Sequence, residues 1–205
     1  MMFLDKFNNY YAPRLVSPAG SNPVRDRAST LRHVFRELND KTNVVFVETG
    51  TTRGDHGSLA FGDDGCATII FDDYVSQNGG VVYTVDIEMK NCEHCKSLVS
   101  DNVKVYNDDS VNFLWNYTGP PIDVFYMDSY DFVKENQHPS KFHHIKELLA
   151  ATKHLKDGSI IIIDDHDALL DGSGDGKGSY VKDFMENIGM EKLFEGYQIG
   201  WKWKK

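Results

Sequence analysis

Short apolar runs alternate along the chain with segments in which apolar residues recur at helical spacing. Uninterrupted runs of β-branched and aromatic residues are typical of strands that are buried on both faces of a sheet. Such runs occupy residues 43–50, 80–86, 103–108, 121–128 and 159–164. The intervening segments 66–80, 92–102, 110–115 and 142–158 are predicted to form helices. Strands that alternate with helices predict an α/β fold, a parallel sheet with helices on both faces.

The two ends of the chain depart from this alternation. Residues 1–42 predict an irregular arm and then one amphipathic helix, with Leu31, Val34 and Phe35 on its apolar face. Residues 191–205, "EKLFEGYQIGWKWKK", contain no intervening helix and predict a C-terminal antiparallel hairpin at the sheet edge. We therefore expect one globular unit at 43–205, preceded by the arm and helix at 1–42.

Composition narrows the class of protein. The 205 residues, 40% hydrophobic and 12% aromatic, are enough for one domain with a substantial core. A formal charge of -9 argues against nucleic acid bound over the whole surface. Because the sequence contains neither a long apolar run nor an apolar leader, we expect a cytoplasmic protein with no membrane partner. Three cysteines cannot form a disulfide framework, and Cys92 with Cys95 lacks a second pair at zinc-finger spacing.

Each predicted strand ends in a carboxylate. In an open parallel sheet, ligands bind beyond the carboxyl ends of the strands, so these residues predict a functional edge. They are Glu48, Asp86, Asp108, Asp109, Asp128, Asp164 and Asp165. A helix cap is the alternative role for Asp86, and for Asp108 or Asp109 before "SVNFLW".

The order of "VETGTTRG", "VYTVDIE", "KVYNDDS", "DVFYMDSYD" and "GSIIIIDDHD" resembles class I S-adenosylmethionine-dependent methyltransferases, over residues 43 to 205. The resemblance implies a Rossmann-like fold, with the methionine group near Glu48 and Gly50, the ribose on Asp86 and the adenine near Asp109. The full set of cofactor contacts that it implies is Glu48, Thr49, Gly50, Thr51, Gly54, Asp86, Ile87, Asp108, Asp109 and Asp128.

Within that superfamily, "YMDSYD" paired with "IIDDH" resembles the divalent-metal-dependent O-methyltransferases of the catechol and macrocin type. Asp128 ends one strand, and Asp164 with Asp165 ends the strand expected beside it, so the three carboxylates can converge. An oxygen-only ligand set favours a hard cation, Mg²⁺ first and Mn²⁺ or Ca²⁺ as alternatives. His166 is an additional candidate ligand or base, although a lone His beside a carboxylate is more often a hydrogen-bonded structural group.

The general base departs from the family pattern. Catechol-type enzymes place a lysine shortly after the first metal aspartate, where this chain has Asp131, with Lys134 three residues further on. Asp131 is the first candidate for the base, followed by His166 and Lys134, and a helix cap is the alternative for Asp131. The Gly-rich segment 171–178 is predicted to be a flexible loop that borders the acceptor pocket.

The leading hypothesis is a metal-assisted O-methyltransferase that acts on a hydroxylated small molecule, a sugar or a diol. The alternatives are metal-dependent hydrolysis or hydroxylation on the same fold, and a non-catalytic nucleoside-binding module. The long connection after Gly54 is a candidate lid, with His56 and Ser58 as candidate contacts. The arm, with Tyr10, Tyr11, Arg14 and Arg25, is expected either to close the acceptor side or to join a homodimer.

Overall fold

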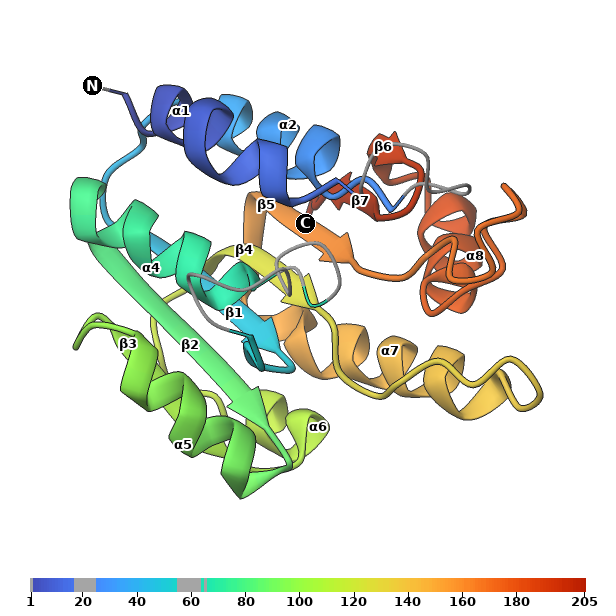
Figure 1. The fold of residues 1–205 in the computed structure, drawn as a ribbon. Helices are drawn as coiled ribbons and strands as arrows, with labels where there is room; N and C mark the ends of the chain where they lie inside the picture. The colour runs from blue at the N-terminus through green and yellow to red at the C-terminus, as the bar shows by residue number, and fades with distance from the viewer. Residues whose placement is uncertain (1, 17–24, 55–63, 65) are drawn as a thin grey trace.

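The computed structural model describes residues 2–16, 25–54, 64 and 66–205, and they form one sheet with helices on both faces (Figure 1). Its strands are β1 (Val44–Thr49), β2 (Gly80–Asp86), β3 (Val103–Asn107), β4 (Ile122–Met127), β5 (Leu155–Ile163), β6 (Glu191–Glu195) and β7 (Ile199–Lys202). The α-helices are α1 (Phe3–Lys6), α2 (Ala28–Leu38), α4 (Ala67–Asn78), α5 (Met89–Leu98), α6 (Ser110–Trp115), α7 (His138–Ala151) and α8 (Ser179–Asn187).

The strand order is β3-β2-β1-β4-β5-β7-β6. The pairs among β1 to β5 are parallel, and β7 runs antiparallel to both β5 and β6. The predicted parallel sheet and C-terminal antiparallel hairpin are therefore confirmed. The chain builds β2 and β3 on one side of β1 and then places β4 on the other side. This switch point between β1 and β4 is where an open α/β sheet forms a crevice.

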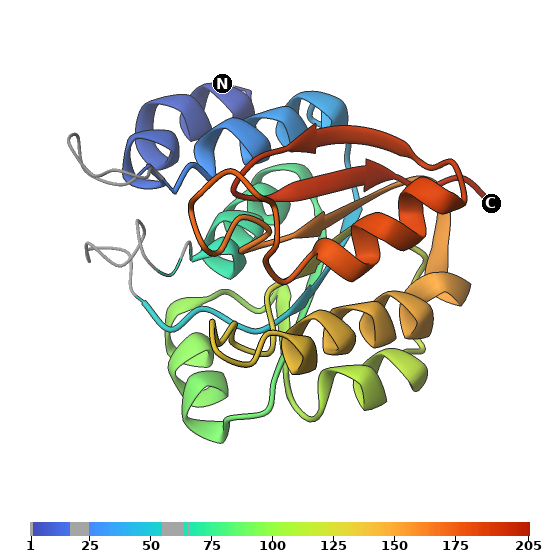
Figure 2. The same cartoon turned by 90° about the vertical axis from the view of Figure 1, so that its right-hand side faces the viewer.

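Alternate residues of the central strands feed two separate cores, because successive side chains of a strand point to opposite faces. Phe46, Tyr126 and Ile162 pack in one core with residues of α1, α2 and α4. Phe125 and Ile163 pack in the other core with residues of α6, α7 and α8. Figure 2 shows these two helical layers on either side of the sheet. Burial on both faces explains why the strands read as continuous apolar runs.

Within residues 2–16, the described part of the N-terminal arm, the chain is largely helical, which corrects the expected irregular arm. After α1, the chain continues as a π-helical turn (Phe7–Tyr11) and a 3₁₀ turn (Ala12–Arg14). Phe3, Phe7 and Tyr11 recur every fourth residue and are at most 2% exposed, which is the spacing of one helix face. The rings of Phe3 and Phe35 lie 4.8 Å apart in an edge-to-face arrangement. The arm thus belongs to the first core.

The boundary between α7 and β5 also differs from the expected one. The helix was predicted to extend through residue 158, but it ends at Ala151 and a 3₁₀ turn (Thr152–His154) leads directly into β5. Leu155 then pairs with Ile122 of β4, so strand pairing takes over from the helical pattern. Among the described residues, none of the helices combines the length and apolar character needed to cross a bilayer.

Candidate active site

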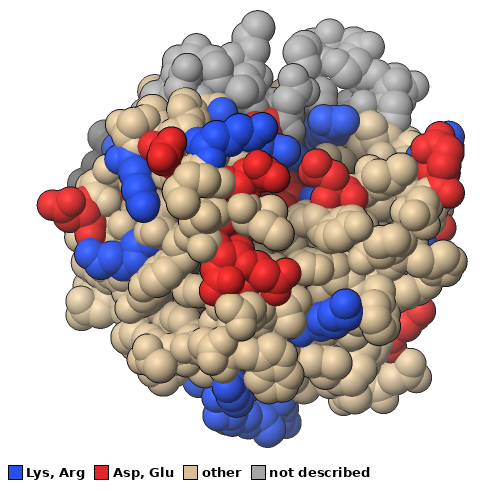
Figure 3. Space-filling model, turned by 90° about the horizontal axis from the view of Figure 1, so that it is seen from below, with Lys and Arg blue, Asp and Glu red and all other residues tan. Residues whose placement is uncertain are grey.

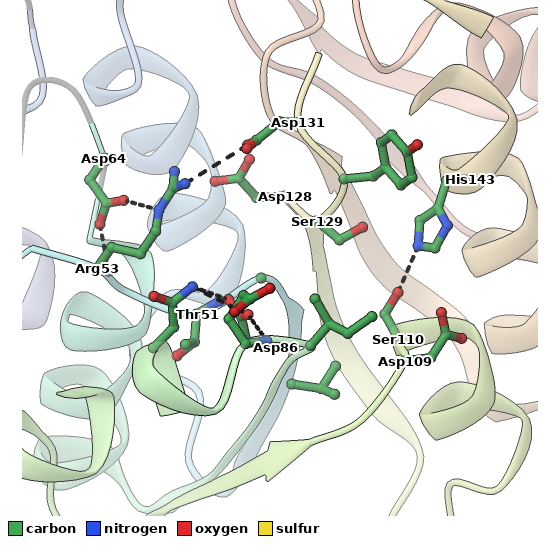
Figure 4. A pocket seen from close by; sticks show the side chains of 16 residues that line it. Thr51, Arg53, Asp64, Asp86, Asp109, Ser110, Asp128, Ser129, Asp131 and His143 are labelled. Atoms are coloured by element: carbon green, nitrogen blue, oxygen red, sulfur yellow. Dashed lines mark hydrogen bonds and ion pairs between the residues drawn. The ribbon is translucent and has the colours of Figure 1, made fainter. Parts of the chain in front are cut away.

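A cavity of about 370 Å³ opens beyond the carboxyl ends of β1, β2 and β4, at the switch point (Figure 4). Six of the ten expected cofactor contacts line it: Gly50, Thr51, Asp86, Ile87, Asp109 and Asp128. The other four, Glu48, Thr49, Gly54 and Asp108, are not part of the lining. On the face seen in Figure 3, Asp and Glu side chains gather near the centre, and the cavity lining is likewise rich in carboxylates.

Gly50 makes the tight turn that brings β1 to the cavity. Its φ of +80° lies in the region that favours glycine, and its N–H donates to the Val85 carbonyl at 2.8 Å. A Cβ at this position would lie 2.4 Å from the carbonyl oxygen of Asp128, well inside van der Waals contact. Only glycine therefore lets the ends of β1 and β4 approach each other this closely.

Asp86 presents its carboxylate at the end of β2, on the cavity wall. One oxygen accepts from the Glu88 N–H at 2.8 Å and the other from the Thr51 N–H at 3.3 Å. The Asn91 amide also donates to both oxygens, at 3.3 and 3.2 Å. These donors fix the orientation of the carboxylate on the cavity wall.

Asp108 and Asp109 divide the roles that the sequence left open. Asp109 caps α6 by accepting from the Asn112 N–H at 2.9 Å, and it also lines the cavity. Asp108 instead binds the Asn112 side-chain amide at 2.9 and 3.0 Å, away from the cavity. Next to Asp109, Ser110 Oγ lies 2.8 Å from His143 Nε2, and both residues line the cavity.

Glu48 lies beneath the cavity wall rather than in it. Its side chain is buried, and Oε2 accepts from the Thr68 and Thr84 hydroxyls at 2.6 Å each. Burial raises the pKa of Glu48 to about 8, although the two hydroxyl hydrogen bonds oppose the shift. The side chain is therefore neutral near pH 7 and links β1, β2 and α4 from inside the protein.

The carboxylates of Asp128, Asp164 and Asp165 converge as expected, with one oxygen of each lying within 4.8 Å of the others. An unexpected cation, Lys177, lies among them. Its Nζ is 2.8 Å from Asp128 Oδ1 and 3.0 Å from Asp165 Oδ2, and it donates to the Ser129 carbonyl at 3.1 Å. The Lys177 side chain is only 2% exposed, so this ammonium group is a buried part of the cluster.

A second buried cation, Arg27, pairs with the third carboxylate. Its Nε donates to Asp164 Oδ1 at 3.1 Å and Oδ2 at 2.8 Å, and its Nη2 lies 2.8 Å from Oδ2. The Gln198 amide donates to Asp164 Oδ1 at 3.0 Å. Both oxygens of Asp164 thus already accept hydrogen bonds from fixed donors.

A divalent cation does not fit among these side chains as they stand. The ammonium group of Lys177 already bridges Asp128 and Asp165, and Arg27 holds Asp164. Against the effect of burial, Lys177 and Arg27 hold the pKa of Asp165 below its usual range. Burial raises the pKa of Asp128, with Lys177 opposing it. All three acidic residues were predicted from the sequence, whereas their two cationic partners, Lys177 and Arg27, were not.

The three expected proton acceptors lie in different places. Asp131 lines the cavity; its side chain is 82% exposed, and its Oδ1 is 3.8 Å from Arg53 Nη1. Lys134 is exposed and is not in the lining. His166 is fully buried, with Nε2 3.4 Å from Glu195 Oε1, and it is likewise not in the lining. The positions of Lys134 and His166 argue against their expected catalytic roles.

Arg53 is a cavity residue that the sequence reasoning missed. Its Nε lies 2.9 Å from Asp64 Oδ1, and the ion pair with Asp131 extends from the loop after β1 to the loop after β4 (Figure 4). Its place within "GTTRG", directly beside the expected cofactor glycines, was the available signal.

The remaining expected contacts lie either outside the described residues or in the N-terminal arm. The candidate lid residues His56 and Ser58 lie outside the described residues. In the arm, the Tyr11 hydroxyl donates to Asp73 of α4 at 2.9 Å, and Arg14 stacks on the Tyr10 ring at 3.9 Å. These three arm residues are therefore engaged away from the cavity lining.

Comparison with known proteins supports the fold at low sequence identity. No family model and no curated protein matches the sequence. One structure of MycE, a methyltransferase from the mycinamycin biosynthetic pathway, contains Mg, SAH and mycinamycin VI. MycE is 13% identical to this chain, and the two structures match with a TM-score of 0.62. The match covers 98% of this chain and 54% of MycE. This chain thus spans about half the length of MycE.

Two other neighbours are covered almost completely. An O-methyltransferase from Bacillus cereus in complex with SAH is 17% identical, with a TM-score of 0.52 and coverage of 98% of this chain and 90% of that one. A putative O-methyltransferase from Klebsiella pneumoniae is 15% identical, with a TM-score of 0.55 and coverage of 98% and 89%. The chain has the Rossmann-like fold of the class I S-adenosylmethionine-dependent methyltransferases.

Proposed function

We propose that this chain transfers the methyl group of S-adenosylmethionine to a hydroxyl oxygen of a small molecule. The observation that carries the proposal is the cavity at the switch point, which Gly50, Asp86 and Asp109 line together with Asp128 and Asp131. Nucleosides bind in this crevice in open α/β sheets. In the proposed complex, Asp86 accepts hydrogen bonds from the ribose and Asp109 lies near the adenine.

The charge of the cavity supports this ligand. S-adenosylmethionine carries a sulfonium and an ammonium group, and the lining provides the carboxylates of Asp86, Asp128 and Asp131. Complementary charge in a cleft attracts a cationic ligand and orients it. The sulfur is also the leaving group of the reaction, so the cofactor supplies the reactive bond and the protein supplies alignment.

Methyl transfer forms an O–CH₃ bond as the S–CH₃ bond breaks, and the acceptor hydroxyl must lose its proton. Asp131 is the proposed acceptor of this proton, because its carboxylate lines the cavity. The guanidinium of Arg53, 3.8 Å away, restrains it there. The products are the methyl ether, S-adenosylhomocysteine and a proton held by Asp131.

Magnesium, which the sequence predicted, is not part of this proposal. A magnesium site is supported by the three carboxylates and by the Mg in the MycE complex. Lys177 and Arg27, however, already form ion pairs with those carboxylates. The proposed reaction therefore uses no metal. Metal-dependent hydrolysis or hydroxylation requires the same ion and loses its support for the same reason.

The experiment begins with calorimetric titration of S-adenosylhomocysteine in the presence of EDTA. Methyl transfer from labelled S-adenosylmethionine to a panel of sugars and diols follows. Asp131→Asn should lower kcat by about 10²–10⁴-fold, whereas Asp183→Asn, an exposed control on α8, should not. Binding without transfer to any acceptor favours the nucleoside-binding module, and failure to bind S-adenosylhomocysteine rules out the proposed function.

A further inference from the structure

Three carboxylates from two neighbouring strands require a positive charge among them. Asp128 follows β4, and Asp164 with Asp165 follows β5, so the parallel pairing of the two strands forces the three side chains together. Carboxylates at this separation repel one another strongly where water is excluded. What compensates them determines whether the site can accept an ion.

The ammonium group of Lys177 is saturated by this cluster. An ammonium has three N–H donors and no acceptor, and Nζ has three acceptors in reach: Asp128 Oδ1, Asp165 Oδ2 and the Ser129 carbonyl oxygen. No donor is left for a substrate. Lys177 therefore acts through the carboxylates that it holds, of which Asp128 lines the cavity.

The backbone fixes Lys177 in this position. The Lys177 N–H donates to the Asp165 carbonyl at 3.0 Å, and the Gly176 N–H donates to the His166 carbonyl at 2.7 Å. A Cβ on Gly176 would lie 2.0 Å from the Asp165 carbonyl oxygen, so only glycine allows the loop to pack this closely on the end of β5. The Gly-rich loop expected to be flexible is anchored at this point.

The formal charge of the cluster is also consistent with a site that holds no metal. Three carboxylates with Lys177 and Arg27 leave one negative charge, because two cations offset two of the three anions. One negative charge complements the single charge of a sulfonium. A divalent ion added to the five groups would leave a net positive charge beside the sulfonium, which Coulomb repulsion disfavours.

We propose that the ammonium group of Lys177 is a built-in replacement for the divalent cation, holding Asp128 and Asp165 in place so that the site works without a bound metal. The proposal rests on the proposed function, because Asp128 borders the cavity assigned to the cofactor. Lys177 is a positioning residue, and its proposed role is supported by three contacts of the ammonium group and by the nearly complete burial of the side chain.

The test measures Mn²⁺ binding by electron paramagnetic resonance, without any methyl acceptor. The acidic cluster of the wild-type protein should bind no Mn²⁺, so Asp165→Asn should leave Mn²⁺ binding unchanged. Lys177→Ala should gain one Mn²⁺ equivalent at least about tenfold tighter than any wild-type site, because an ammonium at contact distance no longer repels the ion. Lys177→Arg, which keeps the charge, should not gain the site. Lys182→Ala is the matched control, since Lys182 pairs with Glu195 outside the cluster.

Calorimetry with S-adenosylhomocysteine on the same samples separates the two proposals. Wild type should bind it equally in EDTA and in Mn²⁺, whereas Lys177→Ala should bind it more weakly and recover on addition of Mn²⁺, which a merely structural lysine would not produce. Mn²⁺ binding in wild type that Asp165→Asn abolishes overturns the Lys177 proposal, even if Lys177→Ala fails to fold. Loss of S-adenosylhomocysteine binding in wild type overturns the proposed function and leaves the Mn²⁺ result standing.

Discussion

Arg27 and Asp164 form an ion pair across 137 positions of sequence, with side chains that are only 3% and 0% exposed. The pair joins the residue before α2 to the residue after β5, so it ties the N-terminal segment to the central sheet. The Arg27 guanidinium also lies over the Tyr197 ring, 4.9 Å from its centroid. The N-terminal segment is thereby connected to the acidic cluster at the cavity.

Arg27→Met should destabilise the protein by about 3–5 kcal/mol, because removal of one partner leaves a buried carboxylate uncompensated. Urea unfolding followed by circular dichroism measures the loss. Arg36→Met, an exposed position on α2, is the control and should stay within about 0.5 kcal/mol of wild type. Equal effects of the two substitutions would mean that the Arg27 pair adds little to stability.

Gly50→Ala should lose stability and affinity for S-adenosylhomocysteine together. The φ of +80° alone costs about 1–3 kcal/mol in a non-glycine residue, and the added Cβ also collides with the Asp128 carbonyl. Gly158→Ala isolates the first effect, because Gly158 has a φ of +83° and nothing within 4 Å of its Cβ position. Calorimetry and thermal melts should therefore rank Gly50→Ala as clearly worse. Indistinguishable variants would contradict the close approach of β1 and β4.

Asp86→Asn should weaken S-adenosylhomocysteine binding by roughly 10- to 100-fold, since hydrogen bonds to charged groups contribute about 1.5–3 kcal/mol. The substitution removes the charge and places an amide N–H₂ at one of the two oxygen positions, to which either the Glu88 or the Thr51 N–H group donates. Asp108→Asn is the matched change outside the cavity lining and should bind nearly as wild type. A stronger loss in Asp108→Asn would reverse the assignment of the two aspartates.

The central strands could be predicted from sequence because burial on both faces produces continuous apolar runs. The acidic strand ends could be predicted for a similar reason, since parallel strands bring their carboxyl ends to one edge. Lys177 could not, because it belongs to a Gly-rich loop whose path depends on contacts with Asp165 and His166. Nothing local in the sequence states that this lysine is buried.

The same distinction separates the members of the candidate site. Glycine and acidic residues mark a turn or a strand end by themselves, so Gly50 and Asp86 were found. Arg27 acts through a pair separated by 137 positions, a relation that periodicity cannot reveal. The helical arm was missed for another reason: Asn8, Asn9 and Pro13 hide the four-residue repeat of Phe3, Phe7 and Tyr11.

Glu48→Gln should change how stability depends on pH. The unfolded glutamate releases its proton near its ordinary pKa, whereas the folded side chain retains the proton up to a pKa of about 8. A raised pKa in the folded state contributes stability that is complete below the unfolded pKa and is lost as pH rises through the folded one. Wild type should therefore weaken between about pH 5 and 8 relative to Glu48→Gln, by up to a few kcal/mol.

Urea unfolding at several pH values between 5 and 9 measures this difference, and it should level off above the folded pKa. Thr68→Val provides a second, directional check, because the Thr68 hydroxyl donates to Glu48 at 2.6 Å and lowers its pKa. Removing that donor should raise the pKa of Glu48 further and so move the loss of stability to higher pH. Parallel stability curves for wild type and Glu48→Gln across this range would show that Glu48 is ionised in the folded protein.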